Sequence, residues 1–137
     1  LRQVAGLGLP YLASPVESLA VLDANYRRYH LDVAAAGQPA VATIPVMRTV
    51  FVTQDRVQQE RVRTALAAAV PSAMRSKDTA VDDWAIVGDR HYARDKLEEY
   101  EATLNFSHLI VRAGITGVTA DEELRSHEEL LGIAADL

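Results

Sequence analysis

The stretch that decides the fold is PVMRTVFV, residues 45–52. Every residue in it is apolar except Arg48 and Thr49, so a strand built from it would be mostly apolar on both faces. Parallel strands that are covered on both sides show this pattern, whereas half-exposed strands alternate between apolar and polar residues. The stretch therefore predicts a buried strand of a parallel sheet.

The sequence before this strand predicts a helix end, a strand and a long helix. Residues 1–8 fit the last turns of a helix, and LPYLAS (9–14) predicts a short buried strand. The series SPVE (14–17) is typical of a helix start, with Ser14 as the N-cap and a proline at the first helical position. Apolar residues then recur at helical spacing until Gly37 ends the segment.

A further helix follows residue 52. Asp55 can cap it, and an apolar stripe continues to Pro71 through Val57, Val62, Ala65, Leu66 and Ala69. Residues 71–83 are polar and irregular. WAIVGD (84–89) leads into another helix over about residues 90–103, with Asp89 as its cap.

The last part of the chain predicts one strand and one helix. NFSHLIVR (105–112) is an apolar run that ends on Arg112. Thr119 and Glu122 form a capping box at the start of the final helix. The predicted inner face of this helix carries Leu124, His127, Leu130, Leu131 and Ala134.

The order of elements is strand, helix, strand, helix, helix, strand, helix. This alternation predicts an α/β fold with a parallel sheet and right-handed crossovers. Three strands are few for a parallel sheet, and two bare edges would invite pairing with other chains. A (β/α)8 barrel typically needs about 250 residues. We therefore expect residues 1–137 to form one partial (β/α)8 barrel.

Composition excludes several classes of protein. The net charge is −5, whereas nucleic-acid-binding domains usually carry a basic surface. The chain has no cysteine, which removes disulfides and thiolate chemistry and favours a cytoplasmic protein. No apolar run is long enough for a membrane helix, and the four histidines show no metal-ligand spacing. The chain opens on Leu1 rather than methionine, and we expect that it was cut from something longer.

An ordered series of segments carries a resemblance to a known family. AGLGLPYLAS, YRRYH, PVMRTVFVTQD, AIVGDRHYARDKLEEY, SHLIVRAGITG and LRSHEELL resemble the C-terminal portion of the luciferase-like flavin-dependent monooxygenases. The match runs in order over almost all of the chain. It implies that 9–14, 45–52 and 108–112 are strands six to eight of a (β/α)8 barrel whose N-terminal half is absent.

The resemblance also implies a function for the parent protein. Such an enzyme would use reduced FMN and O₂ to oxygenate a small organic substrate, with a flavin reductase as partner in two-component members and a homo-oligomeric assembly. The nearest alternative is a deazaflavin (F420)-dependent oxidoreductase of the same family. The family's catalytic and phosphate-binding positions lie upstream of Leu1, so the isolated chain is expected to be inactive. A truncated, non-catalytic association module and an unrelated α/β domain remain as alternatives.

Candidate site residues follow from barrel geometry, because active sites form at the carboxyl ends of the strands. These ends carry Ser14, beside the barrel-facing candidate Tyr11, then Val52 and Thr53, and the run Arg112, Ala113 and Gly114. Arg112 is always charged and could bind an anionic group of the substrate or the flavin; otherwise it reaches water or pairs with an acidic residue of the next helix, Asp121 or Glu122. No catalytic residue and no metal ligand is predicted.

Two polar residues are expected at the other end of the strands. Arg48 lies inside a buried strand, and a buried charge needs a partner, so we expect an ion pair at the bottom of the barrel. His108 starts its strand and is expected to have a structural role there.

Overall fold

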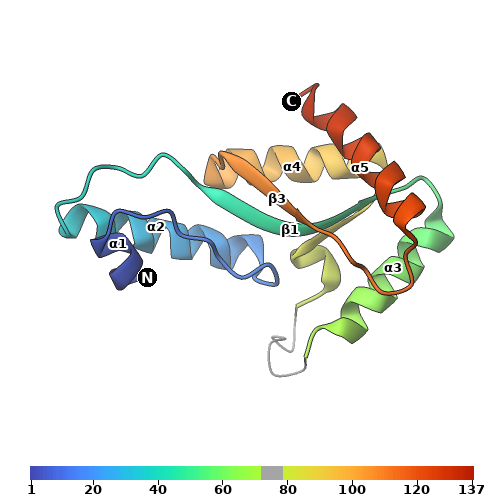
Figure 1. The fold of residues 1–137 in the computed structure, drawn as a ribbon, viewed down its shortest axis with the longest axis horizontal. Coiled ribbons are helices and arrows are strands. Elements are labelled where there is room, and N and C mark those ends of the chain that lie inside the picture. Colours follow the sequence, from blue (N-terminus) through green and yellow to red (C-terminus); the bar gives the residue numbers. More distant parts are fainter. Residues whose placement is uncertain (72–78) are drawn as a thin grey trace.

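The computed structural model describes residues 1–71 and 79–137 and shows an α/β unit built on three parallel strands (Figure 1). The strands are β1 (Pro45–Val52), β2 (Ala85–Gly88) and β3 (His108–Arg112), in the order β2-β1-β3. The α/β class and the parallel direction of the strands are confirmed.

The two outer strands pair with different halves of β1. β3 pairs with its first half, from Pro45 to Thr49, and β2 pairs with its second half, from Thr49 to Val52. The expected neighbours 45–52 and 108–112 therefore lie side by side. Because all strands are parallel, their carboxyl ends share one edge of the sheet, which we call the carboxyl edge.

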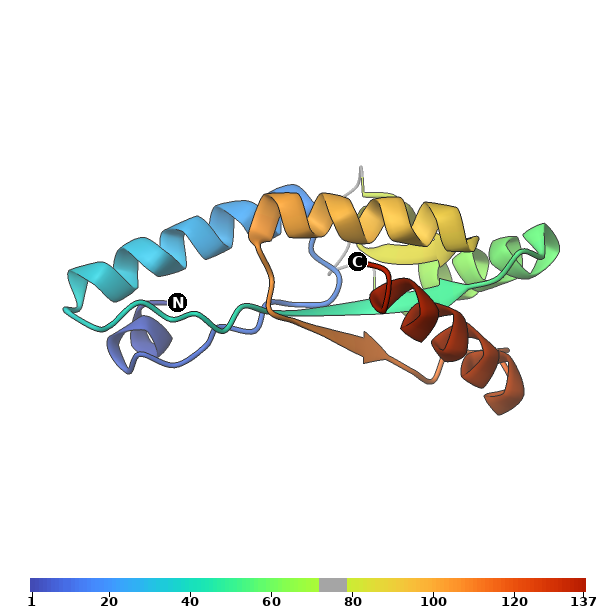
Figure 2. The same cartoon turned by 90° about the horizontal axis from the view of Figure 1, so that it is seen from above.

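Helices surround this sheet. The short α1 (Arg2–Gly6) is followed by α2 (Leu19–Ala35), α3 (Arg56–Ala69), the 3-10 helix η2 (Val81–Asp83), α4 (Arg90–Leu104) and α5 (Ala120–Ala134). Figure 2 shows α2 and α4 following one another along one side of the sheet. None of the helices in the described ranges has the length and apolar character needed to cross a bilayer.

Alternate side chains of β1 face different helices. Val50 and Val52 are buried with α4 and α5, through residues such as Leu97 and Ile133. Phe51 points to the other face, where it is buried with Val62 of α3 and with neighbours that include Trp84. Since successive side chains of a strand alternate, β1 is covered on both faces along its second half, as its sequence predicts.

β3 is covered on one face only. Leu109 and Val111 pack against the α4–α5 cluster, whereas His108, Ile110 and Arg112 are exposed, and Ile110 keeps 39% of its surface accessible. The register places Ile110 beside Met47 and Arg112 beside Thr49. A stretch of parallel sheet thus has one face uncovered within the described part of the chain, which is unusual for parallel strands.

The predicted strand over residues 9–14 is wrong. This segment has no strand hydrogen bonds, and Leu9 and Leu12 are exposed. It nevertheless lies close to the start of β1, because the hydroxyl of Tyr26 donates to the carbonyls of both Tyr11 and Pro45. Hydrogen bonds from side chains of α2 therefore hold this segment in place of the expected hydrogen bonds to a neighbouring strand.

The third strand of the sheet is instead β2, which sequence reasoning took only as a lead into α4. Its four residues are all buried. So short a run shows no periodicity that separates a strand from a buried loop. The sequence predicts an irregular stretch over residues 71–83. Residues 72–78 lie outside the described residues, and the last three residues of the stretch form η2.

The helix starts are confirmed with one exception. Asp55, Asp89 and Thr119 cap α3, α4 and α5, and Thr119 forms the predicted capping box with Glu122. The start of α2 is wrong: its N-cap is Ser18, whereas Ser14 belongs to a turn and only accepts a bond from the Val16 amide at 3.5 Å.

The inner face of α5 also differs from the expected one. Leu124 and Leu131 are exposed, the latter by 70%, and the buried positions are Ser126, Leu130 and Ile133. Ser126 is buried because its hydroxyl accepts a hydrogen bond from the Val52 amide at 2.8 Å. A polar contact with β1 therefore sets the rotation of this helix.

The buried stripe of α3 also differs from the expected one, because Val57 is 78% exposed and lies outside it.

Arg48 does not form the expected ion pair and is held by neutral groups instead. Its side chain is completely buried, and no carboxylate of the described residues pairs with it. Its Nε donates to the Tyr100 hydroxyl at 2.7 Å, and its terminal nitrogens donate to three main-chain carbonyls, those of Pro15, Glu17 and Met47. The guanidinium carbon also lies 5.2 Å from the Tyr100 ring centroid.

We expect Arg48→Met to lower the free energy of unfolding by about 3 kcal/mol, because the carbonyls that accept its hydrogen bonds remain buried without a donor. Urea denaturation measures this change. Arg28→Met is the matched control: Arg28 is exposed and pairs with Asp32 within α2, so its loss should cost less than about 0.5 kcal/mol. Equal losses in the two variants would contradict the role given to Arg48.

Candidate functional site

The carboxyl edge of the sheet brings the ends of three strands and the starts of two helices together. β1 ends at Val52 and is followed by Asp55, the cap of α3, while β2 ends at Gly88 and is followed by Asp89, the cap of α4. The Thr53 amide donates to the Gly88 carbonyl at 2.9 Å and joins these two ends. The edge predicted to carry function is therefore present, and several clefts lie along it, of which two are described below.

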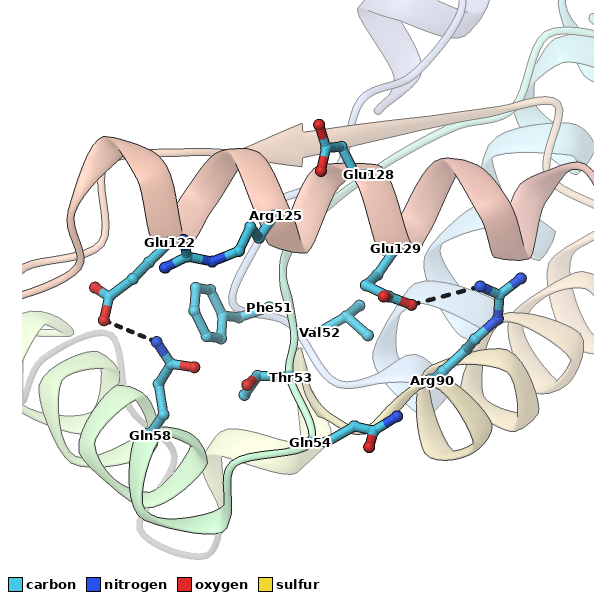
Figure 3. Close-up of a pocket in the computed structure, with 10 residues that line it drawn as sticks. All are labelled: Phe51, Val52, Thr53, Gln54, Gln58, Arg90, Glu122, Arg125, Glu128 and Glu129. Atoms are coloured by element: carbon cyan, nitrogen blue, oxygen red, sulfur yellow. Dashed lines mark hydrogen bonds and ion pairs between the residues drawn. The ribbon is translucent and has the colours of Figure 1, made fainter.

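The first cleft, which we call the α5 cleft, lies between α5 and the carboxyl end of β1 (Figure 3). Its volume is about 330 Å³. It is lined by Phe51, Val52, Thr53, Gln54, Gln58, Arg90, Glu122, Arg125, Glu128 and Glu129.

Most charged groups around the α5 cleft are already paired. Glu122 accepts from Arg61 and from the Gln58 amide, each at 2.8 Å, and Glu129 lies 3.4 Å from Arg90. Arg125 has no hydrogen bond or ion pair to any described residue, and Figure 3 shows its side chain running along the cleft above Phe51. The cleft thus contains one uncompensated guanidinium.

Glu122 is strongly acidic in this setting. Hydrogen bonds from the Thr119 amide, and then from Arg61 and Gln58, lower its pKa from 4.5 to about 2. These donors stabilise the ionised form. The carboxylate is therefore charged at every pH near neutrality, and it fixes α5 against α3.

The second cleft, which we call the Arg112 cleft, lies at the end of β3. It has a volume of about 110 Å³. Arg112, Ala113 and Gly114 line it together with Thr49, Ala65, Leu66, Ala69, Val70, Trp84, Ile115 and Thr116. The amides of Gly114 and Ile115 donate to the Glu123 carboxylate at 2.7 and 3.1 Å, so these two donors are taken.

The structure thus brings three of the predicted site residues together. Arg112, Ala113 and Gly114 share one cleft, and Arg112 pairs with neither Asp121 nor Glu122. Ser14 and Tyr11 lie elsewhere, because the segment that carries them is not a strand ending at the carboxyl edge.

Tyr11 belongs to an aromatic cluster beside α2. Its ring lies 5.3 Å from that of Tyr26 and 5.9 Å from that of Tyr29. Burial, and then the nearby Glu17, raise the pKa of Tyr11, and burial raises that of Tyr26 to about 12. Both phenols are therefore neutral at physiological pH, and their packing gives them a structural role.

Histidines contribute little to the carboxyl edge. His108 starts β3 at the opposite end, as expected, and its Nδ1 lies 2.8 Å from the Ser107 hydroxyl. In the ranges that the structure covers, no group of three or more histidine and acidic side chains could hold a metal ion.

Barrel geometry placed Val52 and Thr53 at the functional edge, but sequence reasoning missed the other polar residues of the α5 cleft. Thr53, Gln54 and Gln58 surround the Asp55 cap, and Arg125 follows Leu124, which was taken as an inner-face residue. The position of Arg125 depends on the rotation of α5, which the Ser126–Val52 hydrogen bond sets. No local sequence signal reports such a contact.

Solved structures share this fold. The chain matches monooxygenase RslO1 from Streptomyces bottropensis with a TM-score of 0.69 and 18% identity, over 96% of this chain and 44% of that one. This chain shares its fold with part of a monooxygenase. The other matches include the oxygenating constituent of 3,6-diketocamphane monooxygenase from the CAM plasmid of Pseudomonas putida, a type II Baeyer-Villiger enzyme in complex with FMN. That match has a TM-score of 0.65 and 16% identity, over 94% and 43% of the two chains.

A third structure, apo-MsnO8, matches with a TM-score of 0.62 and 17% identity, over 98% of this chain and 47% of that one. The chain spans less than half the length of each of these proteins. No protein-family model and no curated protein matches its sequence. The resemblance to flavin monooxygenases is thus confirmed as a likeness of fold.

The low pKa of Glu122 predicts a contribution to acid stability. A carboxyl group whose folded pKa is depressed stabilises the fold above its ordinary pKa, and this stabilisation is lost as the pH falls from about 4.5 through about 2. We expect Glu122→Gln to make the free energy of unfolding less dependent on pH within this range. Urea denaturation at a series of pH values measures the effect.

Glu128→Gln on the same helix is the control, because Glu128 contacts no cation among the described residues. If the free energy of unfolding of Glu122→Gln falls as steeply below pH 4.5 as that of the unsubstituted protein, the role given to Glu122 is contradicted.

Proposed function

We propose that this chain is part of a flavin-dependent monooxygenase that uses reduced FMN and O₂ to oxygenate a small organic substrate. The observation that carries the proposal is the likeness of fold, over 94% of this chain, to an oxygenating enzyme solved with FMN. A separate reductase would supply the reduced flavin.

The Arg112 cleft fits one edge of a flavin better than its phosphate. Arg112 is exposed on the uncovered face of β3 and carries a permanent charge with no carboxylate partner among the residues described. Main-chain amides at this loop could add donors for a phosphate, but those of Gly114 and Ile115 already bind Glu123. The guanidinium remains free for the polar edge of a planar ring.

The volume of this cleft limits what the chain can do alone. About 110 Å³ is less than the roughly 300 Å³ at which ligand pockets begin, so the chain would supply one wall of a larger site. Bound FMN would supply the chemistry of oxygen activation. Arg112 would orient the flavin and stabilise negative charge on it. Trp84 and Ile115 would exclude water, and the loop 113–119 would cover the site.

A specific observation favours a second candidate, an association module without catalysis. The uncovered face of β3, with Ile110 exposed, would gain from contact with another protein surface. This candidate predicts no affinity for flavin.

We expect the chain to bind FMN saturably, as measured by flavin fluorescence during titration under oxidised and reduced conditions. Arg112→Gln should weaken binding about tenfold, because a charge-assisted hydrogen bond is lost. Arg125→Gln is the matched control, since Arg125 is also an exposed arginine without an ion pair to the described residues.

Circular dichroism of each variant shows whether it is folded. A folded chain that binds no FMN, or an equal loss of affinity in both variants, would contradict this placement of the flavin and favour the association module.

A further inference from the structure

We propose that the α5 cleft is a second binding site, which takes a small organic carboxylate with an apolar body. It shares no lining residue with the Arg112 cleft. The proposal therefore does not depend on the assignment of the flavin.

The charge pattern of the cleft leaves one positive charge to be neutralised. Glu122 is held by Arg61, and Glu129 by Arg90, which also lies 3.3 Å from Asp136. Arg125 remains without a partner in the described ranges. Glu128 is one turn further along α5, but Figure 3 shows its carboxylate pointing away from the cleft. A ligand with a single negative charge would complete this arrangement.

Neutral polar side chains line the wall of the cleft opposite this guanidinium (Figure 3). The Thr53 hydroxyl accepts from the Asp55 amide at 3.2 Å, which leaves its own hydrogen free to donate. The Gln54 side chain lines the cleft and makes no hydrogen bond to a described residue. Gln58 is fixed by its bond to Glu122. Arg125 can donate to both oxygens of a carboxylate, which accepts bidentate bonds from arginine. Thr53 and Gln54 offer further donors on the opposite wall of the cleft, Gln54 on the side of Arg90 (Figure 3).

The floor of the cleft selects the rest of the ligand. Phe51 and Val52, apolar residues on opposite faces of β1, line its base where the strand ends. The volume of about 330 Å³ is at the lower end of the range for small-molecule sites. A carboxylate attached to a ring or a short aliphatic chain could place its apolar body against this floor.

A phosphate fits this lining less well than a monoanion. Glu122 and Glu129 lie on either side of Arg125 in Figure 3, and Glu122 stays ionised well below neutral pH. A dianion has a larger desolvation cost than a monoanion, and Arg125 is the one cation of this lining without a partner among the described residues to offset it. A monoanion gains the same guanidinium contact at a smaller desolvation cost, so the cleft favours carboxylate over phosphate.

An occupant would link α5 to the turn between β1 and α3. Arg125 comes from α5, and Thr53 and Gln54 come from the turn between β1 and α3. The present contacts between these parts are the Ser126–Val52 bond and the bonds of Glu122 to Gln58 and Arg61. A bound carboxylate would add a bridge over the carboxyl end of β1.

The test is a titration of the ¹⁵N-labelled chain with benzoate, followed by amide chemical shifts. We expect saturable shifts at Thr53, Gln54 and Arg125, with smaller effects from acetate, which lacks the apolar body, and from inorganic phosphate. Arg125→Gln keeps an amide donor but removes the charge, and it should weaken benzoate binding about tenfold. Arg112→Gln should leave it unchanged.

Three outcomes would overturn the proposal: no saturable shifts at residues 53, 54 and 125, equal affinity of the protein with and without Arg125→Gln, or tighter binding of phosphate than of benzoate. Failure of the flavin assignment gives a different result, because it removes FMN binding and leaves the benzoate shifts in place.

Discussion

The buried guanidinium of Arg48 is the interaction on which the arrangement of this chain depends. It lies in β1, the only strand of the described sheet with a neighbour on each side, and burying a charge without compensation costs several kcal/mol. Its donors reach the Tyr100 hydroxyl on α4 and the carbonyls of Pro15 and Glu17. One side chain thereby fixes the first half of β1, the turn before α2 and the end of α4 relative to one another.

The stagger of the sheet follows from this central strand and separates the two clefts. β3 reaches only Thr49, where Arg112 ends it, while β1 continues to Val52 beside Gly88 of β2. Arg112 therefore lies three residues short of the end of β1, and its cleft forms against Thr49 and Trp84. The α5 cleft forms beyond it, where β1 ends and α5 crosses.

Features encoded by neighbouring residues could be predicted from the sequence, and those set by distant contacts could not. The caps at Asp55, Asp89 and Thr119 are local hydrogen bonds, and the apolar run 45–52 identifies its own strand. Residues 9–14 are as apolar as 85–88, yet only residues 85–88 pair with β1. In the earlier segment the Tyr26 hydroxyl binds the Tyr11 carbonyl, and in the turn that follows Arg48 binds the Pro15 carbonyl, so side chains take the place of strand pairing. Arg112 was found because it ends a strand, whereas Arg125 depends on the rotation of a helix.

The two exposed arginines differ in what surrounds them, and this difference separates their proposed ligands. Arg112 lies on an uncovered stretch of parallel sheet, beside apolar groups of the Arg112 cleft, so a large planar ligand can approach it from the open side. Arg125 lies between two carboxylates that other arginines hold, in a cleft of about 330 Å³, so a small monoanion fits it better than a large planar ligand. Because the clefts share no residue, a carboxylate in one and a flavin at the other would not compete for the same groups. Thr49 of one cleft and Phe51 and Val52 of the other belong to β1, so the central strand of the described sheet is the direct path for any coupling between them.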